Sequence, residues 1–367
     1  MEAADLITAG FWEADSPLLM GRESEVPPGI PPLIYFQSSG STGEPKWIGL
    51  SRTALQVSAA AVNAHLRVDS SSCWALALPL HHVGGFGVAA RTWQAKCRIE
   101  CYRGKWDAAA FTAWLGECGG THLSLVPTQV HDLVATGLRA PESLRAIVVG
   151  GGILSEATGR AARALGWPVL ASYGMTEAGS QIATQSLELL DQPYVTTPLQ
   201  LLPCWDARTD EDGRILIHGA ALFNGILRAE ATGWKYEEHR SEWFASSDLG
   251  RVEGRMLSIA GRADMLVKIL GELVDPVAVE AELLALAGAM PGTAVVVAVP
   301  DERMGHKLVL VHETVTSPWE EVLRCYHEAC AGFRRVAAVI EIKTIPKSAL
   351  GKPRRAEMSR FAAERVI

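Results

Sequence analysis

Residues 38–46 carry the clearest chemical signal in the chain. They read Ser-Ser-Gly-Ser-Thr-Gly-Glu-Pro-Lys and follow a short apolar run at residues 33–36. Small residues let several backbone N–H groups turn toward one point, and the hydroxyls add donors, so this composition suits a loop around phosphate oxygens. The common G-x-x-x-x-G-K-[ST] loop is absent, because Lys46 does not follow a glycine. An ordinary solvated turn is the alternative for such a cluster.

Further polar segments have residue types suited to binding or catalysis. A histidine pair, His81-His82, precedes a glycine-rich bend, and a lone arginine, Arg91, lies in a small and apolar helical segment. For the histidines, the alternative is a packed or helix-capping pair. For Arg91, a helix face that reaches solvent and a charged anchor at the end of a pocket are both open. The later segments are Gly150-Gly151-Gly152, Tyr173-Gly174-Met175-Thr176-Glu177, Ser247-Asp248-Leu249-Gly250, Gly261-Arg262-Ala263-Asp264 and Gly351-Lys352.

Composition limits the class of protein. The 367 residues are enough for two or three domains, and 48% hydrophobic with 20% charged residues is ordinary for a soluble globular protein. The net charge of −7 gives no basic footprint for nucleic acid or an anionic membrane. The N-terminus lacks the basic start and apolar stretch of a signal peptide. No apolar run approaches membrane-spanning length, so we expect a cytoplasmic protein.

The seven cysteines include no C-x-x-C pair. An odd number of unpatterned cysteines indicates reduced thiols, and does not suggest a disulfide framework or a zinc site.

Strands and helices alternate through the first half of the chain. Strands are expected over residues 73–78, 121–126, 145–149 and 169–172, and helices over 51–66, 88–93, 106–116, 129–136 and 155–165. This alternation predicts an α/β fold with a mostly parallel sheet covered by helices. Ligands collect at the carboxyl ends of strands in such sheets. The glycine triplet and the segment 173–177 are expected there, just after two strands.

The second half of the chain has a different pattern of expected strands and helices. From residue 186, short strands and turns indicate a small antiparallel or barrel-like unit. After Gly261–Asp264 the chain restarts with a helix at 276–286, strands at 294–299 and 308–312, and a helix at 318–330. We therefore predict two domains, residues 1–260 and a compact α+β domain at 261–367.

The motifs together resemble the adenylate-forming superfamily of acyl-CoA synthetases, luciferases and peptide-synthetase adenylation domains. They occur in the family's order and cover residues 33–355. The resemblance implies a large N-terminal α/β domain and a small, mobile C-terminal domain that carries a catalytic lysine. It implies ATP, Mg²⁺ and coenzyme A as cofactors or co-substrates, and a small carboxylic acid as the partner. Nucleic acid and membrane insertion are not expected, and a homo-oligomer is left open.

The resemblance also implies the roles of individual residues. Lys352, Thr176 and Glu177 are implied to be catalytic, Glu177 to bind the magnesium ion, and Asp264 to be the hinge between the domains. A helix-terminal charge is the plain alternative for Glu177, a turn residue for Asp248, and a core residue for Tyr173. The implied ATP-binding residues are Ser38, Ser39, Gly40, Ser41, Thr42, Gly43, Lys46, Gly150, Gly151, Gly152, Tyr173, Gly174, Asp248 and Arg262.

Within the superfamily, segments 78–85, 123–129, 150–152 and 300–307 resemble the o-succinylbenzoate–CoA ligases of menaquinone biosynthesis. This implies that 2-succinylbenzoate, ATP and CoA are converted to 2-succinylbenzoyl-CoA, AMP and diphosphate in menaquinone or phylloquinone biosynthesis. Arg91 is implied to anchor the distal carboxylate. The other implied substrate residues are His82, Thr128, Ser180 and Gln181.

Two departures from the family pattern limit the resemblance. Only 32 residues precede the first apolar strand, where the family has a longer segment, and Leu270-Gly271 stands where the family has Gly-Gly. The alternatives are a ligase for another aryl or acyl acid, an enzyme that loads a carrier-protein thiol, and a nucleotide-binding relative without ligase activity.

Overall fold

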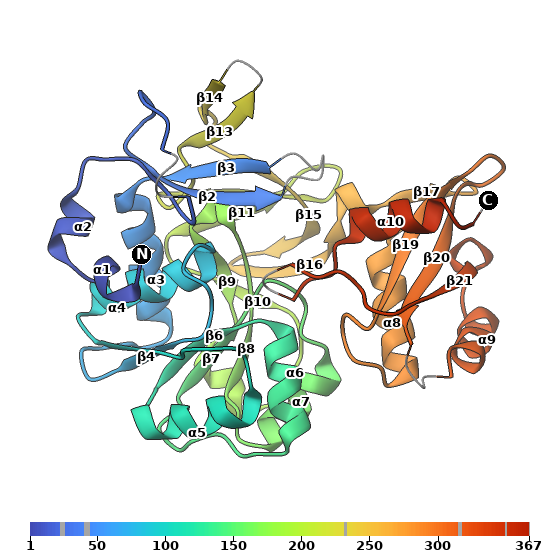
Figure 1. The fold of residues 1–367 in the computed structure, drawn as a ribbon, viewed down its shortest axis with the longest axis horizontal. Helices are drawn as coiled ribbons and strands as arrows, with labels where there is room; N and C mark the ends of the chain where they lie inside the picture. Colours follow the sequence, from blue (N-terminus) through green and yellow to red (C-terminus); the bar gives the residue numbers. More distant parts are fainter. Residues whose placement is uncertain (23–25, 40–44, 231–232, 315–317, 349–350, 367) are drawn as a thin grey trace. The chain divides into compact units, whose positions relative to one another are not determined.

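The computed structural model describes residues 1–22, 26–39, 45–230, 233–314, 318–348 and 351–366 (Figure 1). The chain divides into two compact units. The first contains Met1–Ser246 and Gly250–Ile259, and the second contains Ser247–Leu249 and Ala260–Ile367.

Five parallel strands form the centre of the first unit. They are β4 (Cys73–Leu76), β5 (Arg98–Cys101), β6 (His122–Leu125), β7 (Ala146–Val149) and β8 (Val169–Met175), and they lie side by side in the order β5-β4-β6-β7-β8. All residues of β4, β6 and β7 are buried, as expected of parallel strands covered on both faces. The predicted alternation is therefore confirmed.

Helices alternate with these strands along the chain. Two of them, α3 (Arg52–His65) and α4 (Val83–Ala95), lie on one side of the strands (Figure 1). On the other side lie α5 (Ala108–Cys118), α6 (Pro127–Thr136) and α7 (Glu156–Ala164). Two short helices, α1 (Ala3–Leu6) and α2 (Ala9–Glu13), precede the sheets. Nowhere in the described residues is a helix both long and apolar enough to span a bilayer.

Antiparallel strands continue the same sheet beyond β8. They are β9 (Ser180–Thr184), β10 (Leu199–Leu201), β11 (Trp205–Thr209), β12 (Arg214–Gly219), β15 (Phe244–Glu253) and β16 (Met256–Arg262). A second sheet has the order β1-β2-β3-β13-β14 and contains β1 (Leu18–Leu19), β2 (Ile34–Ser39), β3 (Pro45–Leu50), β13 (Gly225–Glu230) and β14 (Gly233–Glu238). Between residue 186 and Arg262 the described strand pairs are antiparallel, as predicted, but these strands join the two sheets above and form no separate sheet among the described residues.

Local chemistry explains where the helices begin. The Ser51 side chain accepts a hydrogen bond from the Ala54 N–H at 3.0 Å, and Asp107 accepts one from Ala110 at 2.8 Å. Pro127 is the first residue of α6, where a missing N–H costs no helical hydrogen bond. The predicted boundaries of α5 and α6 differ from the observed ones by up to two residues.

Two predicted boundaries near the candidate site are wrong. Helix α4 begins at Val83, five residues before the predicted start, so part of the expected glycine-rich bend is helical. Gly85 allows this, because a Cβ there would lie 2.3 Å from the Pro79 carbonyl oxygen. Strand β8 runs on to Met175, so Tyr173 and Gly174 lie within the strand and not after it.

The second unit is an α+β fold, as predicted. Its main sheet has the order β19-β20-β21, formed by β19 (Ala294–Asp301), β20 (Gly305–Glu313) and β21 (Val336–Ile342), and a hairpin pairs β17 (Val267–Ile269) with β18 (Glu272–Val274). Helices α8 (Pro276–Ala287) and α9 (Trp319–Ala329) pack on one face of the main sheet. Helix α10 (Arg355–Ala363) packs on the other face of this sheet (Figure 1). Both faces are apolar because neighbouring valines of β19 point to opposite sides.

Candidate active site

The hairpin of β2 and β3 presents the two ends of the predicted phosphate loop. Ser38 pairs with Lys46 and Ser39 pairs with Pro45 across the two antiparallel strands. The tip of the hairpin, with the predicted ATP-binding residues Gly40, Ser41, Thr42 and Gly43, lies outside the described residues.

Lys46 and Glu177 form an ion pair in the first unit. The Lys46 Nζ donates a hydrogen bond to the Glu177 Oε1 at 3.0 Å, and the two side chains are 26% and 12% exposed. Glu177 lies with Thr176 on the 3₁₀ turn η2 (Thr176–Ala178), which directly follows β8. The backbone oxygen of Glu177 accepts the Phe223 N–H at 2.9 Å, which fixes this turn. The structure thus brings together the lysine of the predicted phosphate loop and the predicted metal ligand.

Gly174 is required for the path of β8. A Cβ at this position would lie 1.8 Å from the Ser180 carbonyl oxygen on the neighbouring strand β9. A side chain there would therefore force β8 and β9 apart and displace Thr176 and Glu177.

The glycine triplet lies at the carboxyl end of β7, beside β8. Val149 pairs with Ala171, and the Ser172 hydroxyl donates a hydrogen bond to the Val149 carbonyl oxygen at 3.0 Å. Gly151 and Gly152 are exposed, and Gly151 has a φ of +79°, which favours glycine. The half-buried Tyr173 lies two positions further along β8. Open backbone near an aromatic residue is suited to a flat heterocycle.

Arg91 is a fully enclosed cation in the same unit. Its side chain comes from α4 and the residue is 1% exposed, so the predicted alternative of a solvent-facing arginine is wrong. The Nη1 donates to the Ser124 hydroxyl on β6 at 2.9 Å, and the Nη2 donates to the Ser180 hydroxyl on β9 at 3.1 Å. The guanidinium carbon lies 5.2 Å from the centre of the Trp74 ring, a cation–π distance.

The partners of Arg91 among the described residues are neutral. Burial lowers the pKa of the guanidinium to about 9, with no carboxylate to oppose the shift. The Nε atom is buried without a hydrogen-bond partner in the described part of the chain. A buried cation that lacks an anion is costly, because its desolvation is not compensated. This arrangement is suited to receiving an anionic group.

Of the other predicted substrate residues, some contact Arg91 and some have different partners. Ser180 contacts it, whereas the buried Gln181 accepts a hydrogen bond from the Thr184 hydroxyl at 2.6 Å. The amide oxygen of Gln181 is thus bonded within β9, and its assignment to the acid stays a prediction. His82 is the residue before α4, with its ring 4.4 Å from that of His81. Thr128 is the second residue of α6.

Sequence reasoning missed Ser124 and Trp74. Both lie in apolar runs that read as buried strands, so neither has a local pattern that marks it as a contact of Arg91. The only available signal was the position of Ser124 within the segment 123–129, which resembled the ligase group.

In the second unit, Arg262 joins two predicted site residues. Its Nε and Nη2 atoms donate to the two carboxylate oxygens of Asp264 at 2.9 and 2.7 Å. Its Nη1 donates to the Asp248 Oδ1 at 3.2 Å. The predicted ribose ligand and the predicted hinge residue therefore share one guanidinium.

Lys352 lies on a tight turn of the second unit. Its backbone N–H donates to the Ser348 hydroxyl at 3.2 Å, and its carbonyl oxygen accepts the Ser348 N–H at 2.8 Å. Lys347 and Pro353 form an antiparallel bridge across the turn. Lys352 is an exposed residue.

A family model described as "AMP-binding enzyme" matches residues 12–227, which is more than half of the chain. This chain belongs to the AMP-binding enzyme family. The matched range includes the β2–β3 hairpin, Arg91, the glycine triplet and Glu177.

Curated relatives of this AMP-binding enzyme include 2-succinylbenzoate–CoA ligases. The protein of that name from Enterococcus faecalis is 27% identical over 332 residues, which are 86% of this chain and 66% of the relative. Its namesake from Bacillus mycoides is 28% identical over 349 residues, 90% of this chain and 70% of the relative. The chain thus spans about two thirds of the length of these relatives.

Solved structures show that the AMP-binding enzyme has a known fold. It resembles o-succinylbenzoate CoA synthetase (MenE) from Bacillus subtilis in complex with the acyl-adenylate intermediate OSB-AMP, with a TM-score of 0.76 and 23% identity over 89% of this chain and 68% of the other. It also resembles ATP-bound MatB from Rhodopseudomonas palustris, with a TM-score of 0.73 and 24% identity over 90% and 68% of the two chains.

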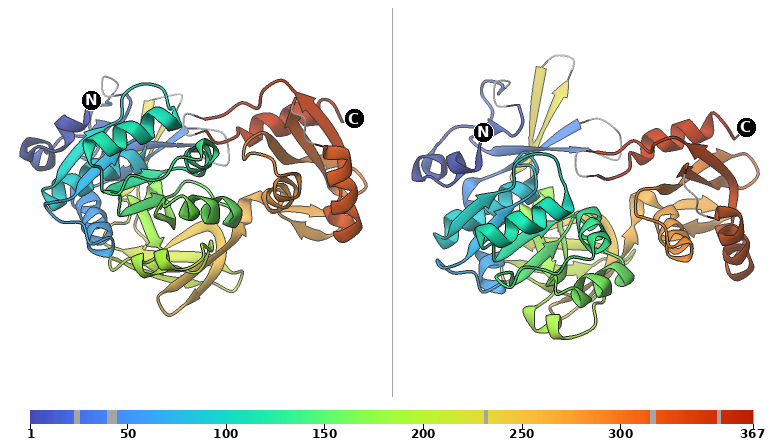
Figure 2. Two further views of the ribbon diagram at one scale, coloured as in Figure 1. Left: turned by 90° about the horizontal axis from the view of Figure 1, so that it is seen from below. Right: turned by 60° about the horizontal axis from the view of Figure 1, so that its bottom comes forward.

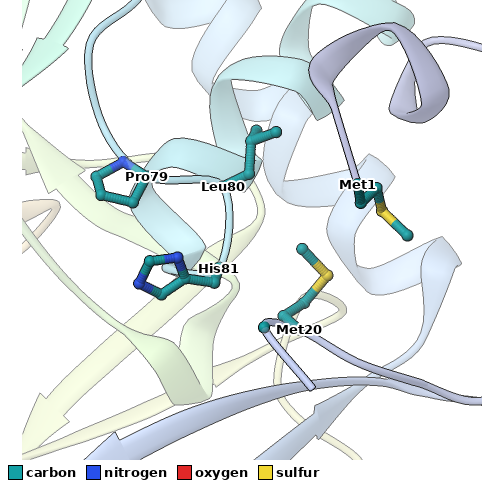
Figure 3. A pocket seen from close by; sticks show the side chains of 6 residues that line it. Met1, Met20, Pro79, Leu80 and His81 are labelled. Carbon is teal, nitrogen blue, oxygen red and sulfur yellow. The ribbon is translucent and has the colours of Figure 1, made fainter. Parts of the chain in front are cut away.

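Two hollows in the described chain lie apart from the predicted site residues. One, of about 360 Å³, lies in the first unit and is lined by Met1, Met20, Gly21, Pro79, Leu80 and His81 (Figure 3). The other, of about 680 Å³, lies in the second unit and is lined by His312, Pro318, Trp319, Glu320, Leu323, Arg324, His327, Val339 and Glu341. Neither hollow contains a residue that the sequence predicted for ATP or acid binding.

Proposed function

We propose that this AMP-binding enzyme is an ATP-dependent carboxylate–CoA ligase. Its acid is 2-succinylbenzoate, and its products are 2-succinylbenzoyl-CoA, AMP and diphosphate, formed in the cytoplasm during menaquinone or phylloquinone biosynthesis. The observation that carries the choice of acid is Arg91, a buried guanidinium whose described partners are neutral. The names of the curated relatives support the same acid.

The first step activates the acid. A carboxylate oxygen attacks the α-phosphorus of ATP, the bond from that phosphorus to the β-phosphate oxygen breaks, and diphosphate leaves. Two anions must approach each other, so positive charge and fixed donors are needed around the phosphates. We assign Lys46, Ser38 and the backbone of the glycine triplet to nucleotide binding. Lys352 supplies the ammonium that contacts the reacting oxygens.

The second step transfers the acyl group. The sulfur of coenzyme A attacks the acyl carbonyl carbon, the bond to the adenylate oxygen breaks, AMP leaves, and the thiol proton is released to solvent. We propose that the second unit moves between the two steps about Asp264. A short segment that absorbs backbone rotation lets one pocket exclude water in two different reactions. The bidentate contact of Arg262 with Asp264 then has to adjust to this movement.

A magnesium ion fits the chemistry of Glu177. Mg²⁺ in nucleotide sites is commonly held by one or two carboxylates together with phosphate oxygens and water, and Glu177 offers one carboxylate beside the Thr176 hydroxyl. When bound, the ion neutralises phosphate charge. The carboxylate of Glu177 is already oriented by Lys46, which keeps it ready to accept a cation.

Arg91 is assigned to the carboxylate that does not react. A carboxylate can accept two hydrogen bonds from one guanidinium, and such charge-assisted bonds are about twice as strong as neutral ones. Ser124 and Ser180 hold the guanidinium in place from two different strands. Diacids with the carboxylate at the right distance therefore gain binding energy that monoacids lack.

Diphosphate release and ATP–diphosphate exchange across a panel of acids test this proposal. The panel contains 2-succinylbenzoate, the two analogues that each lack one of its carboxylates, benzoate, and fatty acids of several lengths. We expect strong exchange with 2-succinylbenzoate and thiol-dependent release of AMP when coenzyme A is added.

Other outcomes identify the alternatives. Exchange with a different acid alone would replace 2-succinylbenzoate as the substrate. AMP release that needs a carrier protein and ignores coenzyme A would indicate a carrier-loading enzyme. ATP binding by calorimetry without any exchange would leave a nucleotide-binding relative.

A further inference from the structure

A largely buried ion pair lies close in sequence to Lys352. Arg355, the first residue of α10, donates from Nη1 and Nη2 to the two carboxylate oxygens of Glu280 on α8, both at 2.6 Å. The side chains are 23% and 9% exposed, so the pair is mostly withdrawn from water. This bidentate geometry fixes the direction of both side chains.

The pair also contacts the backbone of β19. The Glu280 Oε2 accepts the Val296 N–H at 2.9 Å, and the Arg355 Nη1 donates to the Val296 carbonyl oxygen at 3.3 Å. Strand β19 lies at the end of the order β19-β20-β21. The pair therefore satisfies backbone groups of Val296 and ties the start of α10 to both α8 and β19.

Only a short, hydrogen-bonded stretch of chain separates this pair from Lys352. Arg355 is three residues further along the chain, and the intervening Arg354 donates its N–H to the Pro346 carbonyl oxygen at 2.8 Å. The bridge between Lys347 and Pro353 closes the turn just inside that contact. A shift of Arg355 must therefore shift the backbone of Lys352.

A second carboxylate holds the other end of the turn. The Glu313 Oε1 accepts the Ile345 N–H at 2.8 Å and lies 3.9 Å from the Lys347 Nζ. The turn is thus fixed by Glu313 where it begins and by Glu280, through Arg355, where it ends. Glu280 differs in being the more buried of the two carboxylates.

We infer that Glu280 and Arg355 are positioning residues for Lys352 in the adenylation step. Buried ion pairs contribute little net stability, because desolvation offsets their attraction, but they do fix geometry. An ammonium on a flexible four-carbon side chain reaches the reacting oxygens productively only if its backbone is held in place. The inference rests on the proposed function, since it gives Lys352 its reaction.

The test compares two half-reactions in Glu280→Gln and Arg355→Lys. The first is diphosphate exchange, which requires Lys352, and the second is thioester formation from coenzyme A and synthetic acyl adenylate, which does not. We expect exchange turnover to fall about tenfold to 100-fold with the KM values for ATP and acid little changed, because small displacements cost up to about 100-fold. Thioester formation should stay near the wild-type rate. Arg355→Lys keeps the charge, so it serves if Glu280→Gln fails to fold.

Controls separate positioning from stability. Arg334→Gln breaks the 2.7 Å pair with Glu282 on the same helix α8, away from the turn, and should leave both half-reactions unchanged. Hydrogen exchange of the amides in residues 345–348 and 351–356 should accelerate in the Glu280 and Arg355 variants and not in the control. In a Lys352→Ala background, Glu280→Gln should cause no further loss of exchange turnover.

Several results would overturn the inference. Equal losses in both half-reactions would indicate a purely structural pair, and so would a further loss on top of Lys352→Ala. Unchanged exchange turnover in folded Glu280→Gln and Arg355→Lys, with Lys352→Ala impaired, would refute the inference while leaving the proposed function intact. Full exchange by Lys352→Ala would refute the role of Lys352 itself.

Discussion

The proposed choice of acid depends on one residue, Arg91. A guanidinium held by two serine hydroxyls and an indole ring keeps its charge, because its pKa of about 9 remains above neutral pH. Gly87 leaves room for it, since a Cβ there would lie 3.1 Å from the Arg91 Nη2. Both features are consistent with a cation that is kept in place for a ligand.

Replacing Arg91 should change substrate preference. In Arg91→Ala, kcat/KM for 2-succinylbenzoate should fall by about 100-fold, since charge-assisted hydrogen bonds contribute about 1.5–3 kcal/mol. The monoacid that keeps the reacting carboxylate should lose far less. Steady-state diphosphate release with both acids gives the ratio, which does not depend on how much of the variant is folded. Equal losses for the two acids would remove Arg91 from this role.

His122 is a buried histidine with a structural role. It is 1% exposed on β6, its Nδ1 lies 2.8 Å from the Thr121 hydroxyl, and its Nε2 lies 3.3 Å from the Leu66 carbonyl oxygen. Burial lowers its pKa to about 4. The folded protein therefore holds this imidazole neutral where an unfolded chain would protonate it.

This shift predicts acid sensitivity. The unfolded state binds the proton first as pH falls below about 6.5, so the contribution of His122 to stability is complete above that pH and is lost between about 6.5 and 4. The loss should approach about 3 kcal/mol, at 1.36 kcal/mol per pKa unit. Urea unfolding across this range should show a shallower pH dependence for His122→Asn than for the wild type. Identical slopes would contradict the assignment.

At the scale of elements, the β17–β18 hairpin has an unusual turn. Leu270 has a φ of +54° and is 55% exposed, and Gly271 follows with a φ of +88°. The left-handed conformation costs an L-residue roughly 1–2 kcal/mol, and an exposed side chain recovers little of that by packing. A glycine at position 270 would avoid this cost.

Removing the Cβ at this turn should therefore stabilise the second unit. The free energy of unfolding should be about 0.5–1 kcal/mol higher for the Leu270→Gly variant than for the Leu270→Ala variant. Relief of the left-handed strain outweighs the greater conformational entropy of glycine in the unfolded chain. The alanine variant is the matched control, since it removes the side chain and keeps the strain. Denaturant unfolding measures the difference, and a less stable glycine variant would contradict the argument.

Much of the element order was predictable from sequence, because the signals are local. Ser51 begins the helix expected over residues 51–66, and serine is a favoured residue at a helix start; its side chain does cap α3. The start of α4 was not predictable from the sequence. It depends on the close approach of Gly85 to the Pro79 carbonyl oxygen, which occurs only once the turn has folded. The contacts of Arg91 with Ser124 and Ser180 join three elements that are distant in sequence, so spacing along the chain gave no indication of them.

At the scale of the whole molecule, the residues proposed for binding and catalysis are divided between two units. The first contains Lys46, Arg91, the glycine triplet and Glu177, and the second contains Lys352. The two half-reactions should therefore respond differently to changes in the second unit.

Lys352→Ala should separate the two steps. ATP–diphosphate exchange should fall by about 100-fold to 1,000-fold, the usual cost of removing one group that stabilises transition-state charge. Thioester formation from synthetic acyl adenylate should be nearly unaffected, because that step needs no ammonium at the phosphate. Rapid-quench measurements of both steps provide the comparison. Parallel losses would show that the lysine serves folding and not adenylation.

The contact between Lys46 and Glu177 has a consequence for the choice of nucleotide. While no ligand is bound, each charge is neutralised by the other. ATP bound to Mg²⁺ supplies phosphate oxygens to the Lys46 ammonium and a metal ion to the Glu177 carboxylate. Each of the two side chains can therefore replace the other with a new partner at the same time. Metal-free ATP would attract the lysine and leave the glutamate facing a polyanion. The chain should therefore discriminate between the magnesium complex and the bare nucleotide before any bond is made.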